Sequence, residues 1–107
     1  MSSVPPYQVE RRAVYVERPN LRLQELQIRP DQSIPWHLHR RAQDIVYVVE
    51  GEVRIFLRDP DEEVRLGPGQ TYTVRAGRPH HVTNAGTESA TFLNIQGPDT
   101  YDFVPIP

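Results

Sequence analysis

The amino-acid sequence predicts an all-β protein, an antiparallel sandwich or barrel, and three observations support this. Turn signals rich in Gly, Pro, Asn and Asp recur about every eight to twelve residues. The runs between them are short and rich in Val, Ile, Tyr and Thr, and several alternate apolar with polar residues as half-buried strands do. No segment longer than about ten residues keeps a helical period without an interrupting Gly or Pro. Many short strands with regular turns are typical of sandwiches and barrels.

Taken in chain order, seven runs have the pattern of strands: residues 13–17, 21–29, 45–50, 52–58, 71–75, 80–84 and 91–96. The second run alternates most clearly, with Leu21 and Leu23 on one face. Its phase then slips at Glu25, after which Leu26 and Ile28 continue the apolar pattern. We expect a bulge or a helical turn at this point.

The chain has 107 residues, the size of one domain, and neither a boundary nor an internal repeat interrupts it. We therefore expect a single domain over residues 1–107, with an N-terminal arm at 1–11 and a C-terminal tail at 98–107. Charged residues make up 24% of the chain and hydrophobic residues 37%. This composition argues against wholesale disorder.

Composition also excludes several classes of function. The formal net charge is −2, with acidic and basic residues interspersed, so we expect neither a nucleic-acid partner nor binding to an anionic membrane. No apolar run reaches the length of a membrane span, and the first twelve residues lack the order of a signal peptide. The expected protein is soluble and cytoplasmic. It has no cysteine, so any metal must be held by nitrogen and oxygen ligands.

The four histidines fall in two short stretches. His37 and His39 lie two residues apart and would project side by side from an extended strand. Asp44 begins the next strand, on the face that then carries the apolar Val46 and Val48. A carboxylate at the head of an apolar wall is costly unless a charged or hydrogen-bonding group meets it. A divalent metal ion held by the two nearby histidines would do so.

The second stretch contains His80 and His81. In a strand, His80 would share a face with Val82 and Asn84, while His81 would point away toward the surface. Asn84 itself is expected to have a structural role, at the turn that follows it.

These two stretches resemble the two motifs of the cupin superfamily, and together they span residues 31–84. In the first motif, two histidines separated by one residue are followed by a carboxylate and then a glycine, with the spacing of His37, His39, Asp44 and Gly51. Asp31 stands where the family usually begins this motif with glycine. The second motif matches at Gly69, Gly77, His80 and Asn84, with Arg75 where the family has proline.

The resemblance implies a small jelly-roll β-barrel that holds one divalent transition metal ion per chain. The implied ligands are His37, His39, Asp44 and His80. Asp44 is one methylene shorter than the family's glutamate, so it either ligates directly from a closer strand or acts through water. Mixed nitrogen and oxygen ligands suit Fe, Mn, Ni or Zn. The resemblance also implies a homodimer, to which residues 11–18 could contribute a strand that joins a partner's sheet.

The expected ligand is a small oxygenated organic molecule, on which a metalloenzyme would act by dioxygenation, isomerisation or lyase chemistry. Two alternatives are a non-catalytic cupin that binds or senses a small ligand, and a metal-independent epimerase that uses His and Asp as acid and base. No catalytic residue is predicted, although Tyr72, Tyr101 and Asp102 are candidate acid–base groups. The expected substrate pocket contains Trp36, Tyr72, Asn94 and Gln96.

Overall fold

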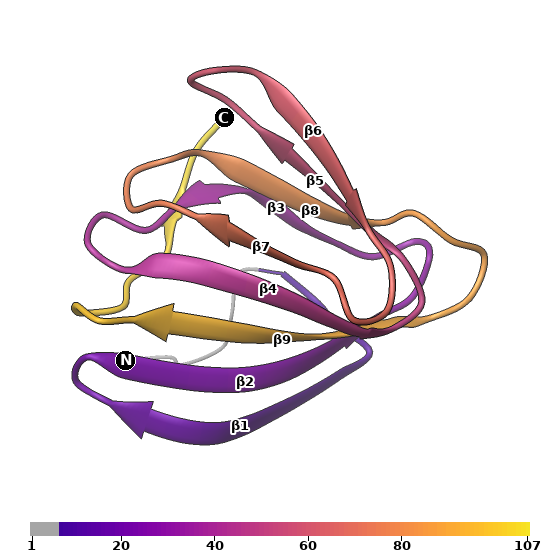
Figure 1. Cartoon of the computed structure of the whole chain (residues 1–107), viewed down its shortest axis with the longest axis horizontal. Coiled ribbons are helices and arrows are strands. Elements are labelled where there is room, and N and C mark those ends of the chain that lie inside the picture. The colour runs from indigo at the N-terminus through magenta and orange to yellow at the C-terminus, as the bar shows by residue number, and fades with distance from the viewer. Residues whose placement is uncertain (1–6) are drawn as a thin grey trace.

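The computed structural model describes residues 7–107, which form ten strands and no helix. Two five-stranded antiparallel sheets face each other (Figure 1). Sheet A has the strand order β1-β2-β9-β4-β7, and sheet B has the order β10-β3-β8-β5-β6. The strands are β1 (Arg11–Arg18), β2 (Leu21–Ile28), β3 (Ser33–Leu38), β4 (Gln43–Glu50), β5 (Val53–Leu57), β6 (Glu62–Leu66), β7 (Thr71–Val74), β8 (His80–Asn84), β9 (Ala90–Gly97) and β10 (Val104–Pro105).

The structure confirms the predicted all-β jelly-roll class, and each of the seven predicted runs overlaps a strand. Three strands lie outside those runs: β3, β6 and the two-residue β10. β6 contains Glu62, Glu63 and Arg65, so it lacks the composition of a strand. It forms the edge of sheet B and pairs only with β5. Charged side chains are tolerated, and useful, on an edge strand because they discourage pairing with another chain.

The predicted irregularity at Glu25 is wrong. β2 pairs with β9 in unbroken register from Arg22 to Ile28, without a bulge or a helical turn. The apolar pattern changes phase because the strand has apolar residues on both faces. Leu26 and Ile28 are buried in the core, whereas Leu21 lies on the opposite face and is 42% exposed.

The core fills the space between the two sheets and is formed by alternate residues of facing strands. Its largest fully buried side chains include Phe92, Leu26, Ile28 and Ile55. At one end of the barrel, Gly51 has a positive φ of 80°, and a Cβ there would lie 2.9 Å from the Cα of Ala90. Only glycine fits this tight turn between β4 and β5.

The two ends of the chain meet the barrel differently. Residues 1–6 of the expected N-terminal arm lie outside the described residues, while Tyr7 and Val9 pack against the core. The C-terminal tail crosses the end of the barrel opposite the Gly51 turn and adds β10 to sheet B, beside His37 and Leu38 (Figure 1). Within residues 7–107, no helix is long and apolar enough to cross a membrane.

Candidate metal centre

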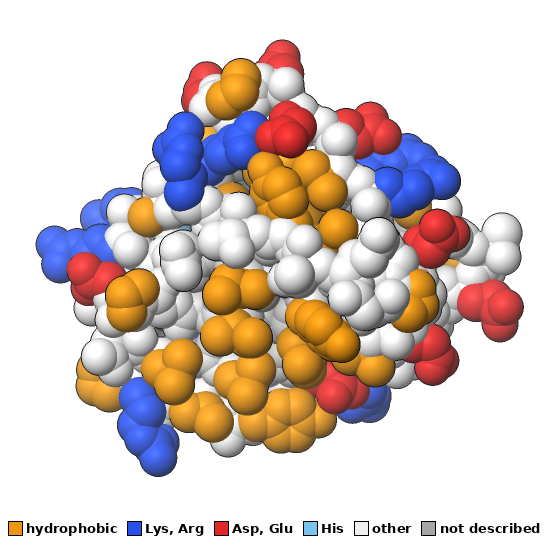
Figure 2. Space-filling model, viewed as in Figure 1, with side chains coloured by type: hydrophobic (Ala, Val, Ile, Leu, Met, Phe, Trp, Pro, Cys, Tyr) orange, Lys and Arg blue, Asp and Glu red, His pale blue; other side chains and the backbone are white. Residues whose placement is uncertain are grey.

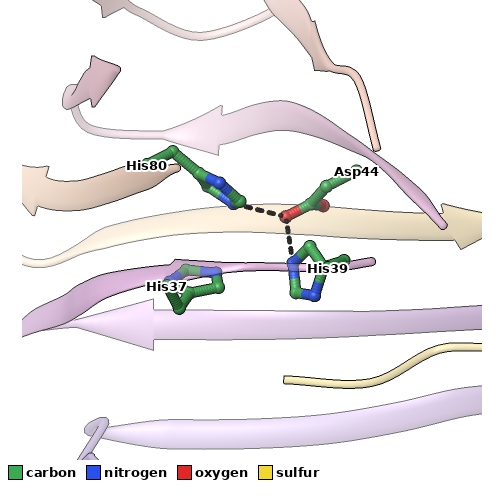
Figure 3. A group of neighbouring side chains, drawn as sticks. All are labelled: His37, His39, Asp44 and His80. Carbon is green, nitrogen blue, oxygen red and sulfur yellow. Dashed lines mark hydrogen bonds and ion pairs between the residues drawn. The ribbon is translucent and has the colours of Figure 1, made fainter. Parts of the chain in front are cut away.

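Three histidines and one aspartate converge inside the barrel (Figure 3). His37 and His80 lie on β3 and β8 of sheet B, His39 follows β3 directly, and Asp44 lies on β4 of sheet A. All four are buried, with exposed fractions of 3% or less. One ligand atom from each residue lies within 4.8 Å of those of the others. The structure therefore brings together the four residues that the sequence singled out.

A local irregularity of β3 orients His37 toward this cluster. The register between β3 and β8 shifts between Ile34 and His37, and His37 is paired with His80. Because of this bulge, Ile34 and His37 both face inward although they are three residues apart. Trp36 is displaced to the outside of the barrel, where it packs against His81 at 5.7 Å between ring centroids.

Backbone carbonyl groups hold the Nδ1 atom of every histidine in the cluster. The pairs are His37 with the Pro35 oxygen at 2.7 Å, His39 with the Asp102 oxygen at 2.5 Å, and His80 with the Arg78 oxygen at 2.9 Å. A carbonyl oxygen only accepts hydrogen bonds, so each Nδ1 carries the proton. In the neutral ring, Nε2 is then unprotonated, and its lone pair is available to a metal ion. Fixing the far nitrogen in this way is a common feature of metal-binding histidines.

The Asp44 carboxylate faces two of these Nε2 atoms. Its Oδ2 lies 3.4 Å from Nε2 of both His39 and His80, and its Oδ1 accepts a 3.0 Å hydrogen bond from Nδ2 of Asn94. Nε2 of His39 is buried and has no well-formed hydrogen bond within residues 7–107. A carboxylate and imidazole lone pairs repel one another at this distance unless a cation lies between them. The cluster is thus complementary to a positive ion.

The electrostatics agree with this complementarity. Burial alone would raise the pKa of Asp44, but the attraction of His39 and His80 outweighs it and holds that pKa well below the usual range. Burial, helped by the neighbouring His80, lowers the pKa of His37 to about 3. Burial also opposes protonation of His39, but the nearby Asp44 carboxylate prevails and raises its pKa. At neutral pH the site therefore offers one anion, the Asp44 carboxylate, and one uncharged imidazole, that of His37.

The donor spacing also fits a transition metal. Two atoms that each lie about 2.1 Å from one ion are about 3.0 Å apart at right angles and about 3.4 Å apart at the tetrahedral angle. The two separations from Oδ2 of Asp44 match the larger value. Aspartate thus reaches the histidines from β4 despite being shorter than the family's glutamate. The donor set suits direct ligation by Asp44.

The cavity beside the cluster is small, with a volume of about 10 Å³. This is close to the space that one water molecule or ion needs and is too small for an organic molecule. Tyr7, Tyr101 and Phe103 close it. The Phe103 ring stacks on His37, with centroids 4.3 Å apart and an angle of 14°, and the Tyr101 ring lies 5.3 Å from that of His39. An organic substrate can enter only if an aromatic side chain moves.

The residues of the expected substrate pocket separate into two pairs. Asn94 and Gln96 face inward, are 3% exposed and line the cavity beside the histidines. Trp36 and Tyr72 lie outside this cavity. Trp36 is covered by the guanidinium of Arg58, 3.8 Å from the ring centroid, on the outer side of sheet B. Tyr72 packs against the core at the edge of sheet A. The bulge in β3 and the peripheral position of β7 account for the difference.

Two of the three candidate acid–base groups, Asp102 and Tyr101, lie beside His39. The Asp102 carboxylate binds the backbone nitrogen and Nε of Arg40 at 2.9 and 2.5 Å. Burial would raise the pKa of Asp102, but Arg40 outweighs it and lowers that pKa. Burial raises the pKa of Tyr101 to about 12, so its hydroxyl stays protonated.

Arg78 is a structural residue that the sequence did not indicate. It is 8% exposed and donates hydrogen bonds to the oxygens of Arg58 and Pro60 and to the side chains of Glu62 and Tyr72, at 2.8 to 3.1 Å. These bonds tie the β5–β6 turn to the segment that precedes β8. The Arg78 carbonyl holds Nδ1 of His80, so the network also positions a candidate ligand.

Comparison with known proteins agrees with the fold and with the motifs. A family model described as a cupin domain matches residues 24–96, and no curated protein matches. An uncharacterized conserved protein with a double-stranded β-helix domain from Klebsiella pneumoniae is 23% identical, with a TM-score of 0.79 over 97% of this chain and 90% of that one. KdgF from Halomonas sp. is 20% identical, with a TM-score of 0.73 over 88% of this chain and 86% of that one.

An oxalate decarboxylase from Lactobacillus farciminis, crystallised as a formate complex, is 17% identical, with a TM-score of 0.74. The alignment covers 81% of this chain but only 27% of the decarboxylase, so the chain spans about a quarter of that enzyme. At these identities the solved structures establish the fold alone. The family model covers most of the chain, including both histidine stretches. This chain belongs to the cupin family.

Proposed function

We propose that this cupin binds one divalent transition metal ion through His37, His39, Asp44 and His80, and that the ion is the reactive centre of an enzyme acting on a small oxygenated organic molecule. The convergence of the histidines carries this proposal. One ring nitrogen from each of three histidines and a buried carboxylate oxygen meet within 4.8 Å, and a backbone carbonyl holds each Nδ1. Histidines whose other ring nitrogen is held in this way are common in metal sites.

The donor set suits Fe, Mn, Ni or Zn, and affinity order alone does not choose among them. With at most four protein ligands, a bound ion keeps positions open for an oxygen-containing ligand and supplies Lewis-acid chemistry there. The chain's own residues orient the histidines and exclude water through Tyr101 and Phe103. The oxalate-named structural neighbours act on a small oxygenated acid, which is consistent with this class of substrate.

A second candidate, a non-catalytic cupin that binds or senses a small ligand, is favoured by one observation. The cavity beside the histidines has a volume of only about 10 Å³ and is closed by aromatic side chains. Turnover of any small oxygenated compound by the metal-loaded protein would support the first candidate, a metalloenzyme. Binding without turnover would decide for the second candidate.

The test is the metal content of untagged protein purified without chelators, determined by mass spectrometry of the elements. The parent is expected to carry close to one transition metal ion per chain. The double variant His37→Ala, His80→Ala is expected to carry none. His81→Ala is the matched control, because His81 follows His80 directly but points out of the barrel toward Phe56 and Trp36. A parent that stays metal-free after incubation with each of the four ions would refute the metal centre and favour a metal-independent epimerase.

A further inference from the structure

An arginine shares the inner face of sheet A with the candidate ligand Asp44. The strand registers pair Arg22 with Gln96 and Gln96 with Asp44, so the three residues form one row across β2, β9 and β4. Directly paired residues project to the same face of a sheet. With strands about 4.8 Å apart, Arg22 lies about 10 Å from Asp44 along this row. The guanidinium is thus near the metal centre without taking part in it.

A cleft of about 410 Å³ opens to solvent beside Arg22. Tyr101 lines this cleft and also lines the cavity beside the histidines. Its ring centroid lies 4.5 Å from the guanidinium carbon of Arg22 and 5.3 Å from the centroid of the His39 ring. The Tyr101 side chain therefore separates the candidate ligands from a cleft that is large enough for a small molecule.

Two polar atoms in this region are buried without a hydrogen-bond partner within residues 7–107: Nε of Arg22 and Oε1 of Gln96. Arg22 also forms no ion pair within that part of the chain. Glu17 is the one acidic residue lining the cleft, against the two arginines Arg18 and Arg22. Buried polar groups are rarely left unpaired, because the lost hydrogen bonds to water are not replaced. Arg22 lines the cleft, whereas Gln96 lines the small cavity on the other side of Tyr101. An unpaired donor and an unpaired acceptor on the two sides of Tyr101 point to a ligand that reaches from the cleft into the cavity and supplies both partners.

We infer that this cleft admits a small organic acid to the metal centre. The ligand's carboxylate binds Arg22, a hydroxyl group of the ligand donates to Oε1 of Gln96, and Tyr101 swings aside to let the ligand reach the ion. The inference rests on the proposed function and assigns its substrate class. Arginine suits the task because its planar fork matches a carboxylate and its bonds to an anion are charge-assisted.

The test is calorimetric titration of the protein, its metal content measured beforehand, with lactate, lactamide and propionate. Lactamide keeps the hydroxyl and loses the charge, and propionate keeps the charge and loses the hydroxyl. The parent is expected to bind lactate at least tenfold more tightly than either. Arg22→Gln should bind lactate and lactamide equally, and Gln96→Met should bind lactate and propionate equally. Arg65→Gln is the control, since Arg65 is exposed on β6 of the other sheet.

The outcomes separate this inference from the proposed function. A lactate preference that persists in Arg22→Gln refutes the role of Arg22 as the carboxylate-binding residue, named here the anchor. Normal metal content in the same sample would still support the metal centre. A parent that prefers lactate through Arg22 but holds no metal supports the anchor and refutes the metal centre. A parent that binds lactate and lactamide equally, or neither, refutes the anchor.

An independent observation concerns the outer face of sheet A, which is apolar across four strands. Figure 2 shows hydrophobic side chains gathered over β2, β9 and β4. By strand register and alternation, the outward residues of this surface, named here the sheet A patch, are Val16, Leu21, Leu23, Ile45, Tyr47, Val49, Leu93 and Ile95. The outer face of β5, β6 and β8 instead carries Arg54, Glu63, Arg65 and Thr83.

The size and charge of the sheet A patch match an interface with a second copy of the chain. Four strands at about 4.8 Å and about six residues at about 3.3 Å give roughly 400 Å², within the range of the largest apolar patch on a typical monomer, which is often functional. A standard interface buries about 800 Å² on each partner, with an apolar centre and a polar rim. The charged Glu25 on this face is already bound by Arg11 and Tyr15 of the same chain. Because the patch then carries little net charge, two copies of it can meet without charge repulsion.

We therefore propose that the homodimer implied by the family resemblance forms through the sheet A patch, face to face, rather than by pairing of β1 edges. Light scattering after gel filtration is expected to give a dimer for the parent. The double variant Tyr47→Lys, Val49→Lys should be a monomer. These side chains are already 40% and 48% exposed, so the monomer tolerates lysine there. Thr83→Lys on the opposite sheet should remain a dimer. A monomeric parent, or a dimer that survives both lysines, would overturn the proposal.

Discussion

Replacing Asp44 by asparagine separates metal binding from folding. The amide has the shape of the carboxylate, so its oxygen can still accept the bond from Asn94. Its NH₂ group would point toward Nε2 of His39 and His80, which lie 3.4 Å from the present Oδ2, and could donate to one of them. The metal-free variant should therefore stay folded with a stability near that of the parent, because the amide keeps hydrogen-bond partners and avoids burying a charge, although it loses the attraction between the carboxylate and the histidines.

The effect on metal binding can be worked out as a thermal shift. An ion present at 100 times its dissociation constant stabilises the fold by about 2.7 kcal/mol. For 107 residues, the unfolding entropy of about 2.1 cal/mol/K per residue converts this to a Tm increase of about 12 °C. Loss of a direct ligand should weaken binding at least 100-fold, the upper limit for residues that act only through a ligand. At the same ion concentration, the variant would then gain only about 0.4 kcal/mol, or about 2 °C.

The assay is thermal unfolding followed by circular dichroism, with and without the ion that the parent carries as purified. Asn94→Leu is a useful comparison, because it removes the bond to Asp44 and leaves all four candidate ligands in place. It should retain a clear shift. A full 12 °C shift in Asp44→Asn would refute direct ligation by Asp44. A metal-free variant that unfolds far below the parent would refute the reasoning about its hydrogen bonds.

Three further predictions concern the surroundings of the site. The His37 pKa falls from 6.5 in the unfolded chain to about 3 in the fold, so stability rises with pH across that window, and the cost at pH 4 is about 3 kcal/mol. His37→Gln removes this cost, so urea unfolding of the metal-free variant should depend less on pH between 4 and 7, and an unchanged dependence would contradict the prediction. Phe103→Ala removes the ring stacked on His37 and should cost about 1 to 3 kcal/mol, less than a fully buried phenylalanine, while speeding removal of the ion by a chelator. Equal removal rates would show that Phe103 does not close the site. Arg78→Met should lower the free energy of unfolding by about 2 to 4 kcal/mol in urea, because several oxygens lose their donor, whereas Arg65→Met should leave it within about 0.5 kcal/mol.

The candidate ligands could be recognised from the sequence because the information that marks them is local. A strand alternates its side chains with a period of two, so His37 and His39 had to project together. The spacing to Asp44 and the second stretch around His80 then matched two motifs in the right order, and the family model confirms the cupin family. The same local pattern placed Asn94 and Gln96 on one face of β9, although it left open which face turned inward.

Other features could not be read from local pattern. The phase slip at Glu25 had the signature of a bulge, yet β2 is regular. The slip exists because the apolar residues of β2 serve two surfaces, the core and the outer face of sheet A. A single strand does not reveal that the whole outer face of its sheet is apolar, since that becomes visible only when β9 and β4 are placed beside it.

The sequence alone determined the strand-rich architecture, the single domain-sized length, the exclusion of thiolate ligands and the identity of the four candidate ligands. Only the tertiary structure decided what surrounds them. The bulge in β3 moved Trp36 out of the barrel, and the tail brought Tyr101 and Phe103 over histidines more than sixty residues earlier. Side-chain alternation and motif spacing act over a few residues, whereas the closure of a cavity depends on packing between segments far apart in the chain.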